Sequence, residues 1–161
     1  MCLSMHQPWA SLLVYGVKRV EGRGWNTDYR GRLWIHAASK PVEQELITSL
    51  EEQYKDIREG IKLPQHYPTS VVLGCVDVVD VLPLAEYNKR KATPTSLPSP
   101  PHHHLSQPIY DEDTDSEYLF ICTNPQKLLI PIAVTGNHKL WKLPKRIYES
   151  AQAALQPIQP I

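Results

Sequence analysis

The densest group of charged residues lies just after Gly16, where Lys18, Arg19, Glu21 and Arg23 follow one another closely. If this segment is a strand, Arg19, Glu21 and Arg23 share one face and Lys18 points to the other. A glutamate between two arginines can hold both guanidinium planes in place, which presents them to a phosphate with little entropy lost on binding. The alternative is a row of surface ion pairs that contributes little to stability.

The net charge of the chain is zero, but the charges are unevenly distributed. Residues 1–40 contain six Lys or Arg against two acids, and residues 119–161 contain five against one, so the middle is acidic. All four tryptophans also lie in the two basic ends. If these ends meet in space, they form a basic surface with aromatic platforms, which is typical of nucleic-acid binding. The alternative is that the tryptophans are core residues and the charge asymmetry is incidental.

On the first interpretation, we predict that DNA or RNA contacts a set of cations and indoles from both ends, with Glu21 orienting its neighbours. The predicted contact residues are Lys18, Arg19, Glu21, Arg23, Trp25, Arg30, Arg32, Trp34, Lys139, Trp141 and Lys142.

Three further residues are candidates for a pocket. His6 and Gln7 precede the predicted first helix, whose free N–H groups favour an anion, although His6 can equally be a simple cap. Asp77 interrupts a strand that is apolar on both faces, so its carboxylate needs a lysine or arginine partner or a bend that leaves it in water.

The chain is punctuated by turn signals that divide it into alternating elements. Pro8 and Gly16 delimit a first helix. The β-branched run 71–82 predicts a central strand that is covered on both sides, as in a barrel wall. Leu33, Ile35 and Ala37 should face one side of a strand and Trp34 the other. The remaining expected elements are strands at 17–23, 32–38, 118–123 and 127–134 and helices at 39–59 and 144–155.

These elements predict an α+β fold, a small mixed β-barrel of about five or six strands flanked by two or three helices. We expect one domain over residues 1–155 and a frayed tail at 156–161. Residues 88–116 are rich in Pro, Ser, Thr and acids, so we expect a disordered low-complexity insertion there. Its run His102–His104 is a weak metal motif, because ligation needs histidines that a fold holds in place.

Composition excludes several classes of protein. No apolar run approaches the length of a transmembrane helix, and we expect no secretory signal. Cys2, Cys75 and Cys122 are scattered and odd in number, which fits a reducing compartment better than a disulfide framework. We expect neither a cofactor nor a bound metal.

An ordered series of motifs resembles the ASCH domain family, in particular the ASCH domain of a transcription coactivator. The series starts at Leu3-Ser4-Met5-His6-Gln7-Pro8-Trp9-Ala10 and continues with Gly16-x-Lys18-x-x-Glu21-x-Arg23. It goes on through Gly31-Arg32-Leu33-Trp34-Ile35, Leu73-Gly74-Cys75-Val76-Asp77, Phe120-Ile121-Cys122-x-Asn124-Pro125 and Trp141-Lys142-Leu143.

The resemblance implies a PUA-like barrel with a cleft beside the first helix and a nucleic-acid-binding module of weak sequence preference. It also implies a monomer in the nucleus and/or cytoplasm, associated with a transcription or helicase-associated complex.

One branch of this superfamily is enzymatic and resembles amidohydrolases that deacetylate a modified cytidine. Its lysine corresponds to Lys18, its threonine nucleophile to Glu21 and its carboxylate to Asp77. Glutamate lacks the hydroxyl that the lysine would activate, so binding is the favoured function. The alternative is an amidohydrolase or another enzyme acting on a modified nucleoside or RNA, with a Lys18–Asp77 pair contacting a base.

Overall fold

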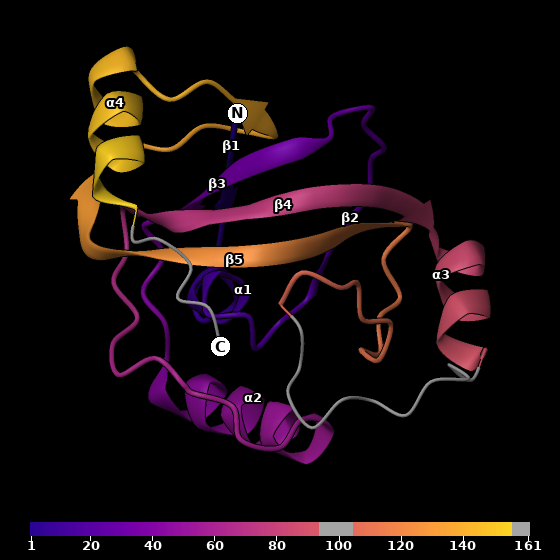
Figure 1. The fold of residues 1–161 in the computed structure, drawn as a ribbon. Coiled ribbons are helices and arrows are strands. Elements are labelled where there is room, and N and C mark those ends of the chain that lie inside the picture. Colours follow the sequence, from indigo (N-terminus) through magenta and orange to yellow (C-terminus); the bar gives the residue numbers. More distant parts are fainter. Residues whose placement is uncertain (94–104, 156–161) are drawn as a thin grey trace.

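The computed structural model describes residues 1–93 and 105–155, which form an α+β fold around one curled sheet (Figure 1). The predicted fold class is therefore confirmed, with six strands and four helices in the described part. The strands are β1 (Cys2–Met5), β2 (Val20–Arg23), β3 (Gly31–Ala37), β4 (Val71–Pro83), β5 (Tyr118–Ala133) and β6 (Leu140–Trp141). The helices are α1 (Trp9–Val14), α2 (Gln44–Ile57), α3 (Leu84–Ala92) and α4 (Lys145–Ala154).

The sheet has the order β2-β5-β4-β3-β1-β6, with β4 in its interior as its β-branched sequence predicts. β1 runs parallel to β3, and every other pair is antiparallel. At one edge Cys2 lies opposite Trp141, so the first and last strands are neighbours. The two basic ends of the sequence do meet in space.

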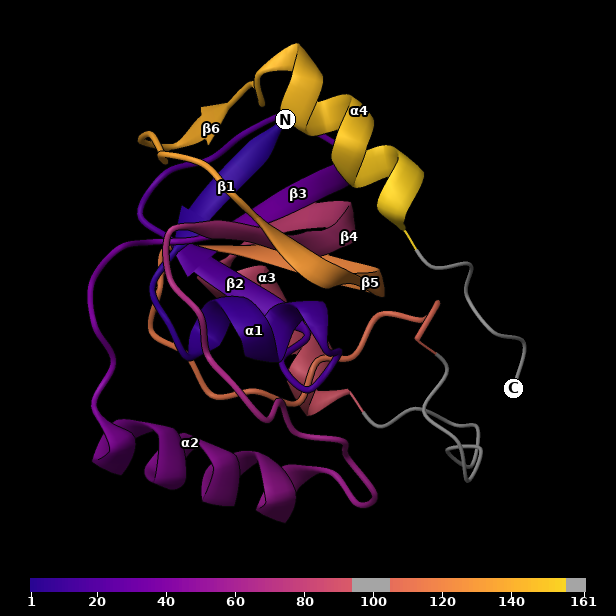
Figure 2. The same ribbon diagram turned by 90° about the vertical axis from the view of Figure 1, so that its left-hand side faces the viewer.

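α1 and α4 lie on opposite faces of the sheet (Figure 2), and the two faces carry separate cores because side chains on a strand alternate. Leu33, Ile35 and Ala37 pack with residues of α1 on one face. Trp34 packs on the other face with residues of α4. The alternation predicted for β3 is confirmed, and it determines which aromatic rings stay accessible.

α2 lies beyond α1 rather than against the sheet (Figures 1 and 2). It begins and ends inside the predicted range 39–59 and packs Tyr54 and Leu50 against Leu12 and Val17. Because α2 contributes Tyr54 to a buried polar cluster described below, it is more than the outer cover that its charged sequence suggests.

β5 is one long strand where the sequence predicted two. The backbone passes Asn124, which has a positive φ of 48°, without leaving the sheet. Between Lys127 and Ile132 the strand loses register with β4, and Leu129 and Ile130 are exposed in this excursion. Pro131 lies there, in agreement with the edge or bulge predicted from its missing N–H.

Part of the segment 88–116 is ordered, contrary to the expectation of disorder. Residues up to Ala92 belong to α3, and residues 105–117 pack against β2 with Glu112 almost fully buried. The acidic run is held because one of its carboxylates has buried partners, which composition does not reveal. Residues 94–104, with the run His102–His104, and residues 156–161 lie outside the described part. Among the described helices, none has the length and apolarity needed to cross a membrane.

Candidate nucleic-acid interface

A cleft of about 1270 Å³ opens where the ends of β1 and β2 face the segment 133–139. Among the described residues, it is lined by two cations, three histidines and one indole, and by no Asp or Glu. These side chains are Arg23, Lys139, His6, His36, His138 and Trp25. The cleft therefore combines positive charge with an aromatic surface.

Arg23 and Trp25 enter the cleft from the end of β2. Arg23 donates from Nη1 to Glu21 Oε1 at 3.2 Å and from Nη2 to the Ser4 carbonyl oxygen at 3.1 Å, and 25% of its side chain stays exposed. Trp25 packs edge-to-face on Phe120, with ring centroids 5.4 Å apart. Both side chains are held by the fold while part of each still faces solvent.

Lys139 reaches the cleft from the opposite side, at the turn before β6. Its backbone has a positive φ of 53°, and its Nζ lies 5.8 Å from the centroid of the Trp25 ring. A cation above an indole is attracted to the ring face. The predicted convergence of cations and indoles from the two chain ends is thus observed for Arg23, Trp25 and Lys139, with His6 beside them.

A directed chain of hydrogen bonds fixes the wall of the cleft. The Trp141 indole N–H donates to Ser4 Oγ at 3.2 Å, and Ser4 Oγ lies 3.0 Å from His36 Nδ1. His36 Nε2 lies 2.8 Å from the carbonyl oxygen of Val134, which can only accept, so Nε2 carries a proton. Burial lowers the pKa of His36, which favours the neutral ring with Nδ1 accepting from Ser4.

Gly136 closes this wall because no side chain fits there. A Cβ at this position would lie 2.6 Å from Ser4 Oγ and from the His36 ring. The backbone of segment 133–139 therefore lies directly over the Ser4–His36 pair and carries Lys139 to its place.

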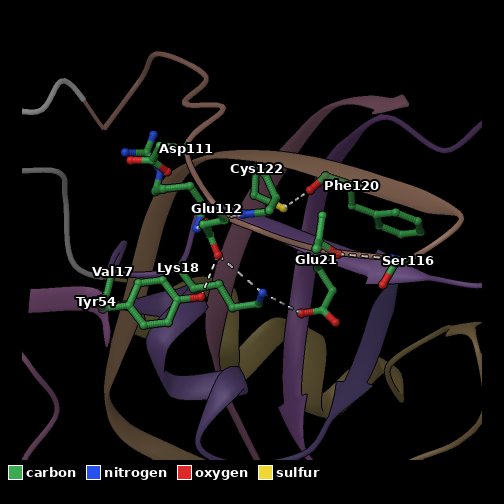
Figure 3. Close-up of polar contacts among 12 residues, drawn as sticks. Val17, Lys18, Glu21, Tyr54, Asp111, Glu112, Ser116, Phe120 and Cys122 are labelled. Atoms are coloured by element: carbon green, nitrogen blue, oxygen red, sulfur yellow. Dashed lines mark hydrogen bonds and ion pairs between the residues drawn. The ribbon is translucent and has the colours of Figure 1, made fainter. Parts of the chain in front are cut away.

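A second group of polar and charged residues, which we call the Glu112 cluster, consists of Glu112, Lys18, Tyr54, Arg58 and Asp111. Figure 3 labels Glu112, Lys18, Tyr54 and Asp111. Glu112 is 4% exposed, and its Oε2 accepts from the backbone N–H groups of Arg19 at 2.6 Å and Val20 at 3.1 Å. Tyr54 donates to its Oε1 at 2.6 Å. One carboxylate thus joins segment 105–117 to the start of β2 and to α2.

Arg58 supplies the main positive charge of the cluster. Its Nη2 contacts Asp111 Oδ1 at 2.5 Å and Glu112 Oε2 at 3.5 Å, and its Nη1 donates to the carbonyl oxygen of Val17. Burial raises the pKa of Asp111, an effect that Arg58 opposes. A buried guanidinium such as that of Arg58 is stable only where carboxylates and hydrogen-bond acceptors compensate its charge.

The structure assigns Lys18, Arg19 and Glu21 to this buried region. Lys18 Nζ lies 3.6 Å from Glu112 Oε1 and 3.8 Å from Glu21 Oε2, so Lys18 contacts Glu21 rather than pointing away from it. The strand prediction fails here because β2 begins only at Val20.

Arg19 was wrongly predicted to be a partner of Glu21 that faces phosphate. It is 2% exposed, and its Nη2 donates to the carbonyl oxygens of Leu105 at 3.1 Å and Gln107 at 2.7 Å. Burial lowers its pKa. Its guanidinium therefore holds segment 105–117, and Arg23 alone contacts Glu21 in the way predicted for both arginines.

Two of the predicted aromatic platforms are core residues. Trp34 is 1% exposed and packs edge-to-face on Tyr148 of α4, and Trp141 is buried with its N–H bonded to Ser4. Arg32 is exposed and lies with its guanidinium 5.8 Å from the Trp34 ring, away from the cleft lining. Neither buried indole has a face free for a base.

The remaining predicted residues lie outside the cleft lining. Arg30 pairs with Asp80 at 3.3 Å, and Lys142 is exposed beyond β6. Gln7 is buried and bonds Ser11 and the Pro68 carbonyl oxygen, so it stabilises the start of α1 instead of facing a ligand. Asp77 accepts from Asn124 Nδ2 at 3.0 Å, and the expected Lys18–Asp77 pair is not formed because Lys18 contacts other carboxylates.

Sequence reasoning missed several residues of the site: Ser4, His36, His138, Tyr54, Arg58 and Glu112. The sequence did contain an indication for His36, since it lies on the same predicted strand as Trp34, which was a candidate contact residue. Glu112 had none, because five acids fall within residues 111–117 and nothing in their order distinguishes the buried one.

Comparison with known proteins places these features in a family. The family model of the ASCH domain matches residues 3–132. This chain belongs to the ASCH domain family. The match includes β1, β2 and the Glu112 cluster, so the ASCH domain contains most of the cleft as well as its support.

The relatives and the solved structure agree with this assignment. Proteins named activating signal cointegrator 1 from Mus musculus and Homo sapiens are each 39% identical over 155 residues, which is 96% of this chain. The chain spans 24% of the length of each. The crystal structure of ASCH from Zymomonas mobilis matches with a TM-score of 0.52 at 16% identity, covering 96% of this chain and 94% of that one, which supports the fold.

Proposed function

We propose that this ASCH domain binds DNA or RNA, with weak sequence preference, in the cleft between β2 and the segment 133–139. The observation that carries the proposal is the charge of the cleft lining. Among the described residues, Arg23, Lys139 and three histidines face the cleft without an acidic side chain. A polyanion would be attracted to Arg23 and Lys139 in this lining, although the chain is neutral overall.

The arrangement of Trp25 and Lys139 supports single-stranded contact. Trp25 packs on Phe120 with the two rings nearly perpendicular, and Lys139 Nζ lies over the Trp25 ring, 5.8 Å from its centroid. A base stacked on this indole would leave its phosphate within the reach of a flexible cation, which is how single strands are bound without reading their sequence.

The enzymatic alternative has less support from the geometry. Lys18 contacts two carboxylates, Glu21 and Glu112, and Asp77 is engaged by Asn124. A lysine in that position would need a hydroxyl to activate, and the matching residue is Glu21. Incubation with acetylated cytidine tests the alternative, since turnover that is lost in Lys18→Ala would favour an amidohydrolase.

The related proteins suggest a setting for the domain. Because two relatives are named activating signal cointegrator 1, we extend the proposal to a monomer that works in a transcription or helicase-associated complex in the nucleus or cytoplasm.

Titration of labelled single- and double-stranded oligonucleotides tests the proposed function. We expect affinity that falls steeply between about 50 mM and about 200 mM salt, because phosphate contacts release counterions. Tighter binding to single strands than to duplex would agree with stacking on Trp25. An absence of binding at the lower salt concentration would contradict the proposal.

A further inference from the structure

An unbroken series of alternating charges connects the cleft to the Glu112 cluster. Arg23 Nη1 lies 3.2 Å from Glu21 Oε1, and Glu21 Oε2 lies 3.8 Å from Lys18 Nζ. Lys18 Nζ in turn lies 3.6 Å from Glu112 Oε1. Glu21 and Lys18 each contact an opposite charge on both sides, and Arg23 ends the series with Glu21 as its carboxylate partner, so the position of each depends on its neighbours.

We propose that Glu112 is a positioning residue for nucleic-acid binding, acting through Lys18 and Glu21 on the guanidinium of Arg23. This inference rests on the proposed function of the cleft. It assigns a role in binding to segment 105–117, although Glu112 itself is almost fully buried and does not line the cleft.

The two carboxylate oxygens of Glu21 have different partners, and this explains how Glu112 can affect Arg23. Glu21 Oε1 holds Arg23, whereas Oε2 is buried, forms an ion pair with Lys18 and has no hydrogen-bond partner among the residues that the structure describes. While Glu112 shares the charge of Lys18, Glu21 remains available to Arg23. Without the Glu112 charge, Glu21 is the carboxylate that still pairs with Lys18 in the described part of the chain, and Lys18 draws it away from Arg23.

Glu112 can transmit this effect because it is itself fixed from several directions. Two backbone N–H groups, the Tyr54 hydroxyl and Arg58 hold its carboxylate, and its own backbone exchanges hydrogen bonds with the Tyr87 hydroxyl at 2.9 and 3.2 Å. A rigid carboxylate gives Lys18 one preferred position and reduces the entropy that Arg23 would lose on binding phosphate.

Glu112→Gln tests the proposal by the sign of its effect. Removing a negative charge should strengthen binding of a polyanion through long-range electrostatics. The proposal predicts the opposite: single-stranded oligonucleotide binds about fivefold more weakly, and the salt slope falls by about one because one phosphate contact is lost. Asp113→Asn is the matched control, since Asp113 lies next in the chain with 95% of its side chain exposed, and its binding should be unchanged or slightly stronger.

A double-mutant cycle separates positioning from a general structural role. In an Arg23→Gln background, Glu112→Gln should cause no further loss of affinity. Tyr54→Phe removes the hydroxyl that donates to Glu112 without changing charge, and it should weaken binding by about twofold. It provides a second route if Glu112→Gln does not fold. Loss of affinity that adds fully to that of Arg23→Gln, or wild-type affinity in a folded Glu112→Gln variant, would overturn the proposal.

A measurement without nucleic acid distinguishes failure of this inference from failure of the proposed function. The side-chain Nε–H resonance of Arg23, which reports on its guanidinium, should shift in Glu112→Gln because Glu21 no longer holds Nη1, and it should stay unchanged in Asp113→Asn. If the wild type binds no oligonucleotide but this resonance responds, the proposed function is wrong and the coupling stands. If the wild type binds and the resonance does not respond, the coupling is wrong.

Discussion

The cleft and the Glu112 cluster start from the same short stretch of sequence but lie in opposite environments. In the Glu112 cluster, Lys18 faces Glu21 and Glu112, and Arg58 faces Asp111 and the same Glu112, so the charges are compensated inside the protein. In the cleft, Arg23 has one carboxylate partner and Lys139 has an indole face. The same residue types stabilise the fold where they are compensated and are available to a ligand where they are not.

This difference follows from which segment of the chain packs against each end of β2. Segment 105–117 covers the start of β2 and supplies both carboxylates and carbonyl oxygens to the cations there. The end of β2 is covered instead by β1, β3 and the segment 133–139, which offer Ser4, His36 and Gly136 but no acid to the cleft lining of the described chain. Whether a charged residue stabilises the fold or stays available to a ligand therefore depends on its burial and its partners, rather than on its charge alone.

The largest expected effect is on the free energy of unfolding, through Arg58. Arg58→Ala removes a cation from the buried Glu112 and the partly exposed Asp111, and the loss of one partner of a buried ion pair costs about 3–5 kcal/mol. Urea denaturation gives the value. Arg30→Ala is the control, since Arg30 forms an exposed pair with Asp80 and should cost less than about 1 kcal/mol. Equal losses of unfolding free energy in the two variants would mean that the buried Glu112 cluster contributes no more to stability than an exposed ion pair.

The second prediction concerns base stacking in the cleft. Trp25→Leu keeps an apolar side chain against Phe120 but removes the indole face, so single-strand affinity should fall by about 1–3 kcal/mol. Fluorescence anisotropy at low salt measures it. Trp34→Phe, a change in the buried core, should leave affinity unaltered while lowering stability. If Trp34→Phe lost as much affinity as Trp25→Leu, the assignment of Trp25 to binding and of Trp34 to the core would be wrong.

Sequence reasoning succeeded where a property is local. The alternation of Leu33 and Trp34 across β3, the apolar run of β4 and the helix-ending Gly16 depend on neighbours in the chain, and the structure agrees with each. The meeting of the basic ends was also anticipated, and the β1–β6 pair produces it.

It failed where a partner comes from far along the chain. Arg19 and Arg23 look equivalent in sequence, but Arg19 is covered by residues 105 and 107 and Arg23 by Ser4 and Glu21. Trp34 is buried by residues of several strands and of α4, whereas Trp25 is only partly buried against the other core, and no local pattern encodes this difference. Long-range burial decides which members of a charged or aromatic motif remain accessible.

The third prediction uses pH to examine the cleft wall. Burial lowers the pKa of His36 below its ordinary 6.5, so as pH falls through about 6.5 the unfolded chain binds a proton before the folded protein does. Stability should therefore decrease below about pH 6.5, by at most about 1.4 kcal/mol per pH unit, until the folded pKa is reached.

His36→Gln serves as the reference for this effect. It should lack that part of the pH dependence in urea denaturation between about pH 7.5 and 5.5. Asp111, whose pKa burial raises, titrates in both proteins and cancels in the comparison. Identical pH slopes in wild type and variant would show that His36 is not held neutral by the Ser4–Val134 hydrogen-bond chain.

The smallest expected effect decides how far the binding surface extends. Lys139 lines the cleft, whereas Lys142 is exposed beyond β6 and outside its lining, so Lys139→Gln and Lys142→Gln remove the same charge from different places. Lys139→Gln should weaken binding a few-fold and lower the salt slope by about one, and Lys142→Gln should change the slope little. A counterion is released only where a phosphate is contacted. If both variants lowered the salt slope by the same amount, the nucleic acid would have to contact Lys142 as well, and the binding surface would extend over β6.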